Sequence, residues 1–254
     1  MGEPARVHNA RGFFIDTRGD SPYLLTKHYS ELEISVQRDR FSCVIFDMDG
    51  TLTQTNELIF ASFNHITQKY LGKCFTPKEI VGFFGPPEEG AIEKLLGAEL
   101  LDQAMDELCE FYRTHHGAMA KLHSGIETIL QLLKERGTRL ALFTGKGHRT
   151  ATITLEAFGI ARFFEYVVSG NDVVNHKPHH EGIQKVLDKF SVSPNEVLMI
   201  GDSMSDVRAS RGAGVKIAAV LWDSYDKERV LAANADFVFH NVGEMHEWFR
   251  LHTN

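Results

Sequence analysis

Cysteine, proline and tryptophan are scarce in this chain, which has three, seven and two of them among 254 residues. The three cysteines form no C-x-x-C pair, so the sequence favours neither a disulfide framework nor a structural zinc site. Long hydrophobic runs are missing too: the longest have about the length of a buried strand, against roughly 20 residues in a membrane-spanning helix. No basic region followed by an apolar segment marks a secretory leader. We therefore expect a cytoplasmic protein without a membrane span.

An excess of positive charge is also absent. The chain has 27 Lys and Arg residues against 34 Asp and Glu residues, a formal net charge of -7, which disfavours nucleic acid as a partner. Its 43% hydrophobic and 24% charged residues are typical of a globular protein and exclude collagen-like and wholly disordered chains. The length fits one large domain, or a core domain with an insertion.

Short apolar runs that alternate with helical patterns begin at Phe41. This alternation predicts an α/β fold, a doubly wound, Rossmann-like parallel sheet with right-handed crossovers. Residues 1–40 have a different, turn-rich pattern, and we interpret them as an N-terminal extension packed on the core, with an oligomerisation or lid element as the alternative. The expected strands are 43–46, 140–143, 166–168, 197–200 and 217–221.

The gap between the first two strands is much longer than one crossover requires. Its sequence has five helical patterns, at 56–70, 77–83, 87–96, 99–116 and 126–136, and the last of these fits the crossover helix. Residues 55–122 are therefore predicted to form an inserted, all-helical cap domain. The catalytic core would then comprise residues 41–54 and 123–254.

Two carboxylates follow the first expected strand, in the run Asp47-Met48-Asp49-Gly50-Thr51. In an extended chain, side chains two residues apart point to the same side, so Asp47 and Asp49 should face one site. Gly50 permits the backbone to turn away. A polar turn is the alternative, but this pattern arises by chance only about a few times in a thousand chains of this length.

Polar residues also follow the next three strands, where ligands bind in an open parallel sheet. Thr144-Gly145 precedes a helix and suits a phosphate, although a Thr-Gly turn is also a common structural device. Lys177 stands before Pro178, which favours an extended backbone there, although most such lysines are solvated. Asp202 and Asp206 flank a helix start, where N-capping by Ser203 or Asp202 is the alternative role.

Together these residues make chemical sense as a site for phosphoryl transfer. Asp47 and Asp202 offer the hard oxygen ligands that Mg²⁺ prefers. Asp47 could serve as the nucleophile and form an aspartyl phosphate, while Asp49 acts as general acid and then general base. The phosphoryl oxygens would be held by Thr144, the Gly145 N–H and Lys177.

These motifs, Asp47-Met48-Asp49-Gly50-Thr51-Leu52, Thr144, Lys177-Pro178 and Gly201-Asp202-Ser203 with Asp206, resemble the four motifs of the haloacid dehalogenase superfamily. The resemblance covers residues 41 to about 240. It implies Asp47 as nucleophile, Asp49 as acid/base, and Mg²⁺ on Asp47, the Asp49 main-chain carbonyl and Asp202. It further implies that Asp206 lies beside the metal or orients the lysine.

Within that superfamily, Thr55-Asn56-Glu57-Leu58, Ser62-Phe63 and the Gly85-Pro86 turn are most similar to the phosphoglycolate phosphatase branch, including its inorganic pyrophosphatases. The resemblance implies a phosphatase acting on a small phosphorylated metabolite or pyrophosphate, as a monomer or homodimer. The chain departs from the usual K-P-x-P-E pattern, because His179 and His180 follow Pro178.

Two other functions remain open at this stage. A sugar-phosphate mutase of the β-phosphoglucomutase type would use the same core and cap, with a sugar hydroxyl in place of water as acceptor. A receiver-type signalling module shares the phosphorylatable Asp, Thr and Lys, but it lacks both a general acid like Asp49 and a helical cap.

Two sets of residues in the sequence have no assigned role. The pairs His115-His116 and His179-His180 are expected to be solvated, because adjacent residues on a helix diverge. Periodicity does not place the cationic side chains of the cap relative to the site. They are Lys69, Lys73, Lys78, Lys94, Arg113 and Lys121.

Overall fold

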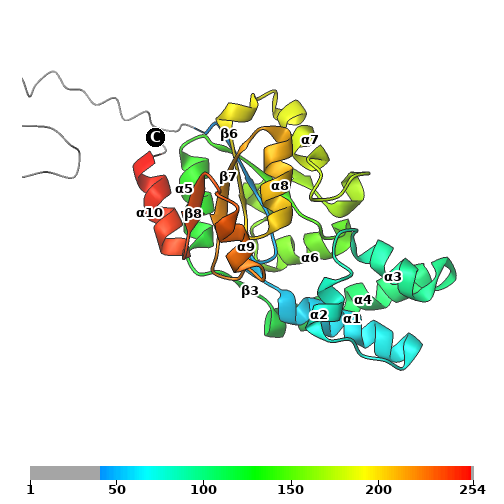
Figure 1. The fold of residues 1–254 in the computed structure, drawn as a ribbon. Helices are drawn as coiled ribbons and strands as arrows, with labels where there is room; N and C mark the ends of the chain where they lie inside the picture. Colours follow the sequence, from blue (N-terminus) through cyan, green and yellow to red (C-terminus); the bar gives the residue numbers. More distant parts are fainter. Residues whose placement is uncertain (1–40, 253–254) are drawn as a thin grey trace, which may run out of the picture. The chain divides into compact units, whose positions relative to one another are not determined.

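Residues 41–252 are described by a computed structural model, and their centre is a six-stranded parallel sheet (Figure 1). The strand order is β5-β4-β1-β6-β7-β8, so the order reverses between β1 and β6, where sheets of this type bind their ligands. The proposed extension over residues 1–40 lies outside the described residues. The strands are β1 Cys43–Phe46, β4 Arg139–Phe143, β5 Tyr166–Val168, β6 Val197–Gly201, β7 Lys216–Val220 and β8 Phe237–Phe239.

Both faces of the sheet are covered by helices, which is why its strands are nearly continuous apolar runs. Val44 and Phe46 of β1 pack into one hydrophobic cluster with α5, α6 and α10, whereas Cys43 and Ile45 pack into another with α7 and α8. The helices are α5 Ile126–Glu135, α6 His148–Ala157, α7 Glu181–Phe190, α8 Met204–Ala213, α9 Lys227–Ala232 and α10 Val242–His252, with 3-10 turns at Ala161–Phe163, Gly170–Asp172 and Pro194–Glu196.

A helical insertion of four helices lies between two short strands that pair antiparallel, β2 Thr53–Gln54 and β3 Lys121–Leu122. The insertion has a hydrophobic cluster of its own, which extends to Ile153 of α6. In Figure 1 the insertion lies at one end of the part of the chain that contains the sheet. Its helices are α1 Asn56–Leu71, α2 Pro77–Val81, α3 Glu88–Leu96 and α4 Ala98–Met119.

The predicted α/β class, with a parallel sheet and an inserted helical region, is confirmed. Strand β8, which has three residues and pairs with β7, and helix α10 are absent from the elements that the sequence predicts. The expectation that His116 is solvated is wrong: it is 3% exposed and packs edge-on against Phe158, since this face of α4 lies on α6. Among residues 41–252, no helix is long and apolar enough to cross a membrane.

Candidate active site

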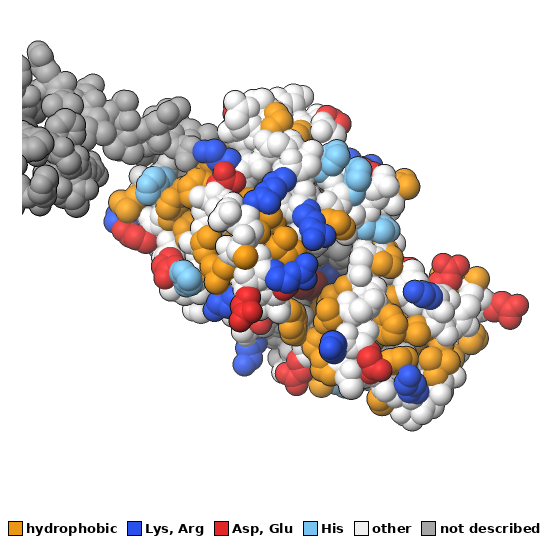
Figure 2. Space-filling model, in the orientation of Figure 1, with side chains coloured by type: hydrophobic (Ala, Val, Ile, Leu, Met, Phe, Trp, Pro, Cys, Tyr) orange, Lys and Arg blue, Asp and Glu red, His pale blue; other side chains and the backbone are white. Residues whose placement is uncertain are grey.

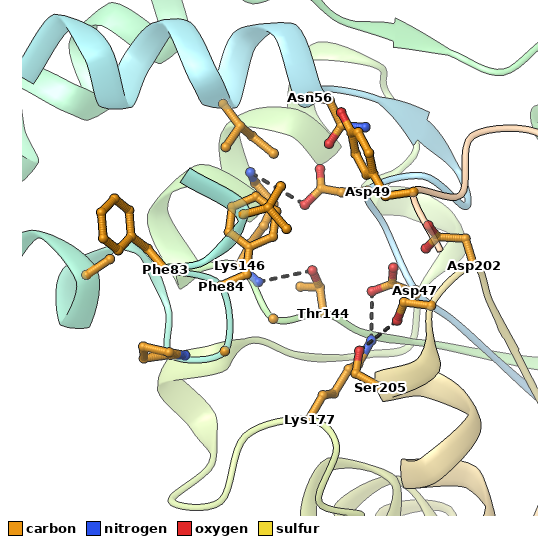
Figure 3. A pocket seen from close by; sticks show the side chains of 18 of the residues that line it. Asp47, Asp49, Asn56, Phe83, Phe84, Thr144, Lys146, Lys177, Asp202 and Ser205 are labelled. Atoms are coloured by element: carbon orange, nitrogen blue, oxygen red, sulfur yellow. Dashed lines mark hydrogen bonds and ion pairs between the residues drawn. The ribbon is translucent and has the colours of Figure 1, made fainter. Parts of the chain in front are cut away.

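The carboxyl ends of the central strands bring the predicted site residues to one cavity of about 460 Å³ (Figure 3). Asp47 directly follows β1, Thr144 follows β4 and Asp202 follows β6, while Lys177 comes from the loop after β5. Each of these four side chains lines the cavity, as do Asp49 and Gly145. Strands that are far apart in the sequence therefore place the predicted groups side by side.

Lys177 connects two of these acids. Its Nζ lies 2.7 Å from Asp47 Oδ1 and 2.7 Å from Asp206 Oδ1. Burial alone would lower the pKa of Lys177, but the two carboxylates raise it above its usual range. Lys177 therefore stays protonated, and its positive charge lies against the Asp47 carboxylate.

Asp206 serves two purposes through its two oxygens. Oδ2 accepts hydrogen bonds from Ser203 N–H at 3.1 Å and Ser203 Oγ at 2.6 Å, in a capping box at the start of α8. Oδ1 holds Lys177. One buried carboxylate thus takes part in the capping box and also holds Lys177, whereas the sequence suggested N-capping by Ser203 or Asp202.

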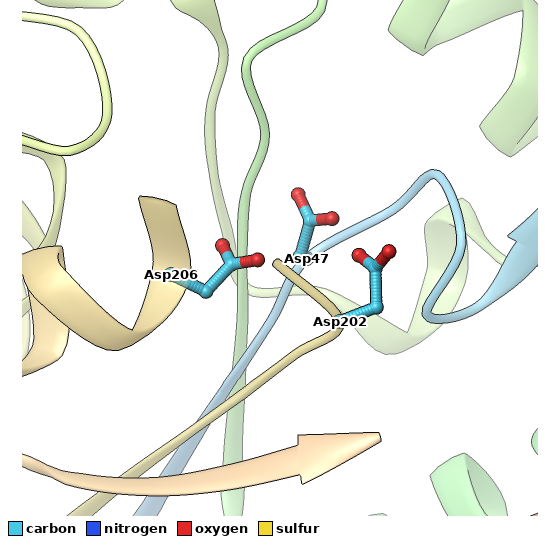
Figure 4. Close-up of side chains that lie close together, drawn as sticks. All are labelled: Asp47, Asp202 and Asp206. Atoms are coloured by element: carbon cyan, nitrogen blue, oxygen red, sulfur yellow. The ribbon is translucent and has the colours of Figure 1, made fainter. Parts of the chain in front are cut away.

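Asp47, Asp202 and Asp206 form a buried acidic cluster, with one oxygen from each within 4.8 Å of the others (Figure 4). Burial raises the pKa of Asp47 to about 7, although Lys177 opposes the shift. Burial and the charges of Asp47 and Asp206 raise the pKa of Asp202 well above its usual value. One ammonium group faces three carboxylates here, so the donor set fits a hard divalent cation.

Gly50 allows the chain to pass close to this acidic cluster. Its φ is 81°, a conformation that is costly for other residues, and a Cβ there would lie 2.5 Å from Asp202 Oδ2. The turn brings Asp49 to the insertion side of the cavity, where it accepts a hydrogen bond from Thr55 Oγ1. Asp49 therefore lines the cavity beside the first residues of the insertion.

Thr144 and Gly145 lie where β4 leads into α6. Thr144 is 1% exposed, and its Oγ1 accepts a hydrogen bond from the Lys146 N–H at 3.2 Å. The Gly147 N–H, at the start of α6, donates to Glu88 Oε2 at 2.5 Å. A carboxylate from the insertion thus occupies part of the helix N-terminus that the sequence suggests for phosphate.

Lys146 is a site residue that sequence reasoning missed, although it follows the Thr144-Gly145 pair directly. Its Nζ lies 3.6 Å from Asp49 Oδ2, 3.4 Å from Glu88 Oε1 and 4.7 Å from the centre of the Tyr112 ring. Burial would lower the pKa of Lys146, but Asp49, Tyr112 and Glu88 raise it above its usual range. The Gly-Lys-Gly turn at a strand end is the local signal that could have indicated it.

The far wall of the cavity comes from the insertion and is mostly apolar. Its polar members are Asn56 and Glu88, and Figure 3 shows Phe83 and Phe84 on this side of the cavity. The other lining residues of the insertion are Ile59, Phe63, Val81, Gly85, Pro86 and Ala91. The cavity thus has a charged end against the sheet and an apolar end against the insertion.

Comparison with known proteins agrees with this geometry. The profile of the haloacid dehalogenase-like hydrolases matches residues 44–220, and the chain belongs to this family. It is 32% identical to the pyrophosphatase PpaX of Anoxybacillus flavithermus over 202 residues, 80% of this chain and 94% of that protein. The predicted haloacid dehalogenase superfamily membership is therefore confirmed, and the protein is an enzyme of the phosphatase class.

Solved structures show the same fold. A predicted phosphoglycolate phosphatase from Haemophilus somnus superposes with a TM-score of 0.71 at 20% identity, over 82% of this chain and 97% of that one. CbbY from Rhodobacter sphaeroides, crystallised with phosphate, has a TM-score of 0.70 at 23% identity, over 81% and 96%. At these identities the similarity supports the fold alone.

Proposed function

We propose that this enzyme is a Mg²⁺-dependent phosphohydrolase of small phosphate esters or anhydrides that works through an aspartyl phosphate on Asp47. The observation that carries the proposal is the placement of Asp47: it lies 2.7 Å from the Lys177 ammonium, within the acidic cluster, at the charged end of the cavity. The similarity to pyrophosphatase PpaX supports a small phosphate compound or pyrophosphate as substrate.

A magnesium ion fits this donor set because the cluster of Asp47, Asp202 and Asp206 carries more negative charge than Lys177 neutralises. Asp47, the main-chain carbonyl of Asp49 and Asp202 would hold the ion, and Asp206 would remain beside it, bonded to Lys177. When bound, Mg²⁺ supplies positive charge that offsets the repulsion between Asp47 and an incoming phosphate dianion.

In the first step, an Asp47 carboxylate oxygen forms a bond to phosphorus while the bond from phosphorus to the leaving oxygen breaks. Lys177, Thr144 Oγ1 and the Gly145 N–H hold the other phosphoryl oxygens, where charge spreads in the transition state. Asp49 donates its proton to the leaving oxygen, which departs as an alcohol or an acid.

In the second step, the same Asp49 accepts a proton from a water molecule that attacks phosphorus. The bond between Asp47 and phosphorus breaks, inorganic phosphate leaves and the Asp47 carboxylate is restored. One residue serves first as acid and then as base because the two steps are chemically the reverse of each other.

We further propose that residues 55–122 act as a cap domain over a core of residues 41–54 and 123–254, and that the cap selects the leaving group. The cavity supports this division, because its insertion wall lies opposite the charged end. We also propose that the enzyme is cytoplasmic and acts as a monomer or homodimer.

The proposal is tested by measuring phosphate release by the wild-type enzyme with Mg²⁺ and with excess chelator, and by the Asp47→Asn variant with Mg²⁺. We expect turnover only with Mg²⁺ and none from Asp47→Asn, because an amide is a poor nucleophile. Acid-quenched wild-type enzyme should gain the mass of one phosphoryl group on the peptide that contains Asp47. The matched control is Asp102→Asn on the exposed side of α4, which should keep full activity. Full turnover in chelator, or by Asp47→Asn, would disprove the mechanism.

A further inference from the structure

The cationic side chains of the insertion do not line the cavity. Of the ten insertion residues in its wall, none is Lys, Arg or His, and six of them are Ile59, Phe63, Val81, Phe83, Phe84 and Ala91. The cations are engaged elsewhere: Lys69 pairs with Glu107 at 2.5 Å, and Arg113 pairs with Glu110 at 2.9 Å. The part of the wall that would contact a leaving group therefore offers it no positive charge.

The two cations that do line the cavity are already paired. Lys177 lies between Asp47 and Asp206, and Lys146 lies between Asp49 and Glu88. The lining contains five carboxylates, from Asp47, Asp49, Glu88, Asp202 and Asp226, against these two ammonium groups. A second anionic group on the substrate would lose its hydration there and find no unpaired cation in the lining to compensate for that loss.

The apolar wall continues to the mouth of the cavity through two exposed aromatic side chains. Phe84 is 46% exposed and Tyr225 is 60% exposed, and both belong to the lining. Figure 3 shows Phe83 and Phe84 on the side of the cavity away from the acidic cluster. On the face seen in Figure 2, hydrophobic side chains also cover much of the insertion. A cavity of about 460 Å³ with this wall is in the range of pockets that bind organic ligands.

We infer that the substrate is a phosphate monoester of an uncharged alcohol with an apolar or aromatic face, and not a compound whose leaving group carries a second anion. This inference rests on the proposed function and narrows it to esters, against the anhydrides and the pyrophosphate that the similarity to PpaX suggests. The phosphoryl group would lie at the charged end, and the alcohol would pack between Phe84, Phe83 and Tyr225. Pyrophosphate and phosphoglycolate, which have anionic leaving groups, would be poor substrates.

A matched pair of substrates tests this inference with the full-length enzyme and Mg²⁺. Benzyl phosphate and phosphoglycolate are both esters of primary alcohols, but only phosphoglycolate has an anionic leaving group; pyrophosphate serves as the third compound. We expect kcat/KM to be at least about tenfold higher for benzyl phosphate than for either of the others. Calorimetric titration of Asp47→Asn should show the same preference in binding, independently of turnover.

Substitution of Phe84 should change this preference in a predictable direction. Phe84→Ala should lower kcat/KM for benzyl phosphate and leave that for phosphoglycolate nearly unchanged. Phe84→Arg should also raise kcat/KM for phosphoglycolate, because it adds an unpaired cation to the wall. Leu100→Arg is the matched control: it adds the same charge at an exposed leucine of α4 that does not line the cavity.

The outcomes distinguish the inference from the proposed function. Phosphate release that is faster from phosphoglycolate or pyrophosphate than from benzyl phosphate would overturn the inference and leave the hydrolase mechanism intact. So would a Phe84→Arg variant with unchanged selectivity. No turnover of any of the three compounds, with no phosphoenzyme, would overturn the proposed function and the inference with it.

Discussion

Lys146 and Glu88 connect the helical insertion to the sheet-containing part, with Lys146 Nζ 3.4 Å from Glu88 Oε1. The same carboxylate accepts hydrogen bonds from the Gly147 N–H at 2.5 Å and from Thr150 Oγ1 at 2.7 Å. A residue at the start of α3 thus caps the N-terminus of α6, where negative charge is favourable. The apolar wall, which includes residues on both sides of Glu88, is linked to the start of α6 by this contact.

Glu88→Gln should destabilise the protein while keeping the volume of the side chain. The amide retains a carbonyl oxygen, but Lys146 loses one of its two carboxylate neighbours inside a buried site. We expect the free energy of unfolding in urea to fall by about 1–3 kcal/mol. Glu99→Gln, in the exposed first turn of α4, is the control and should change it little. Equal stability of the two variants would argue against a structural role for the contact.

Asp202→Asn should remove most of the stability that the folded protein gains from Mg²⁺. Its raised pKa shows that the charge is unfavourable in the folded protein, so without metal the variant should be at least as stable as the wild type. Wild-type protein should gain about 2.7 kcal/mol at a Mg²⁺ concentration 100 times Kd, and Asp202→Asn should gain much less at that concentration. Thermal unfolding with Mg²⁺ and with chelator measures both effects. An equal gain in both proteins would place the metal elsewhere.

Asp49→Asn should affect the two chemical steps differently. A benzyl alkoxide is a basic leaving group, so loss of the acid should slow the first step by roughly 10² to 10⁴. Nitrophenolate needs no proton, so p-nitrophenyl phosphate should still phosphorylate Asp47. The second step then lacks its base, and stopped-flow absorbance should show a burst of nitrophenol approaching one equivalent. Equal losses for both substrates without a burst would contradict the acid/base role.

Gly50→Ala should lower the free energy of unfolding by more than the unfavourable backbone conformation alone explains. At φ 81° a Cβ lies 2.5 Å from Asp202 Oδ2, whereas at Gly72, with φ 65°, a Cβ would meet nothing within 4 Å. Gly72→Ala therefore measures the conformational cost, about 1–2 kcal/mol. Gly50→Ala should lower the free energy of unfolding by more than Gly72→Ala does. It should also weaken Mg²⁺ binding, because Asp202 must move. Identical costs with unchanged Mg²⁺ binding would show that the contact is unimportant.

His123 should make the protein less stable in mild acid. Burial lowers the pKa of His123 to about 4, although the Asp223 carboxylate lies 3.9 Å away. Its usual pKa is about 6.5, so the unfolded chain binds a proton that the folded protein does not. Stability from this source is present above about pH 6.5 and is lost as the pH falls toward 4.

The effect of His123 is measured by comparing wild type with His123→Gln. Partial solvent exposure reduces the expected loss to the order of 1–2 kcal/mol between pH 7 and pH 4.5. The difference in free energy of unfolding between the two proteins should diminish over this range, because the amide does not titrate. A constant difference would show that His123 does not contribute to the pH dependence.

The strands and site residues that the sequence predicts correctly share a local signal. Asp47, Thr144 and Asp202 each follow an apolar run of four or five residues, and the carboxyl ends of parallel strands lie at one edge of a sheet. Strand length does not explain why β8 was missed, because β5 and β8 both have three residues and only β5 was predicted. His116 was mispredicted because helical periodicity indicates that adjacent residues diverge but not which of them meets another helix.

By itself, the sequence determined the α/β class, the place of the insertion and the order of the chemical groups, because each depends on periodicity or on residues adjacent in the chain. Only the tertiary structure decided that Lys146 lies between Asp49 and Glu88, and that no cation of the insertion lines the cavity. These features depend on how α3 and α4 pack against α6. Such packing is set by side chains that are distant in sequence, and no local pattern records it.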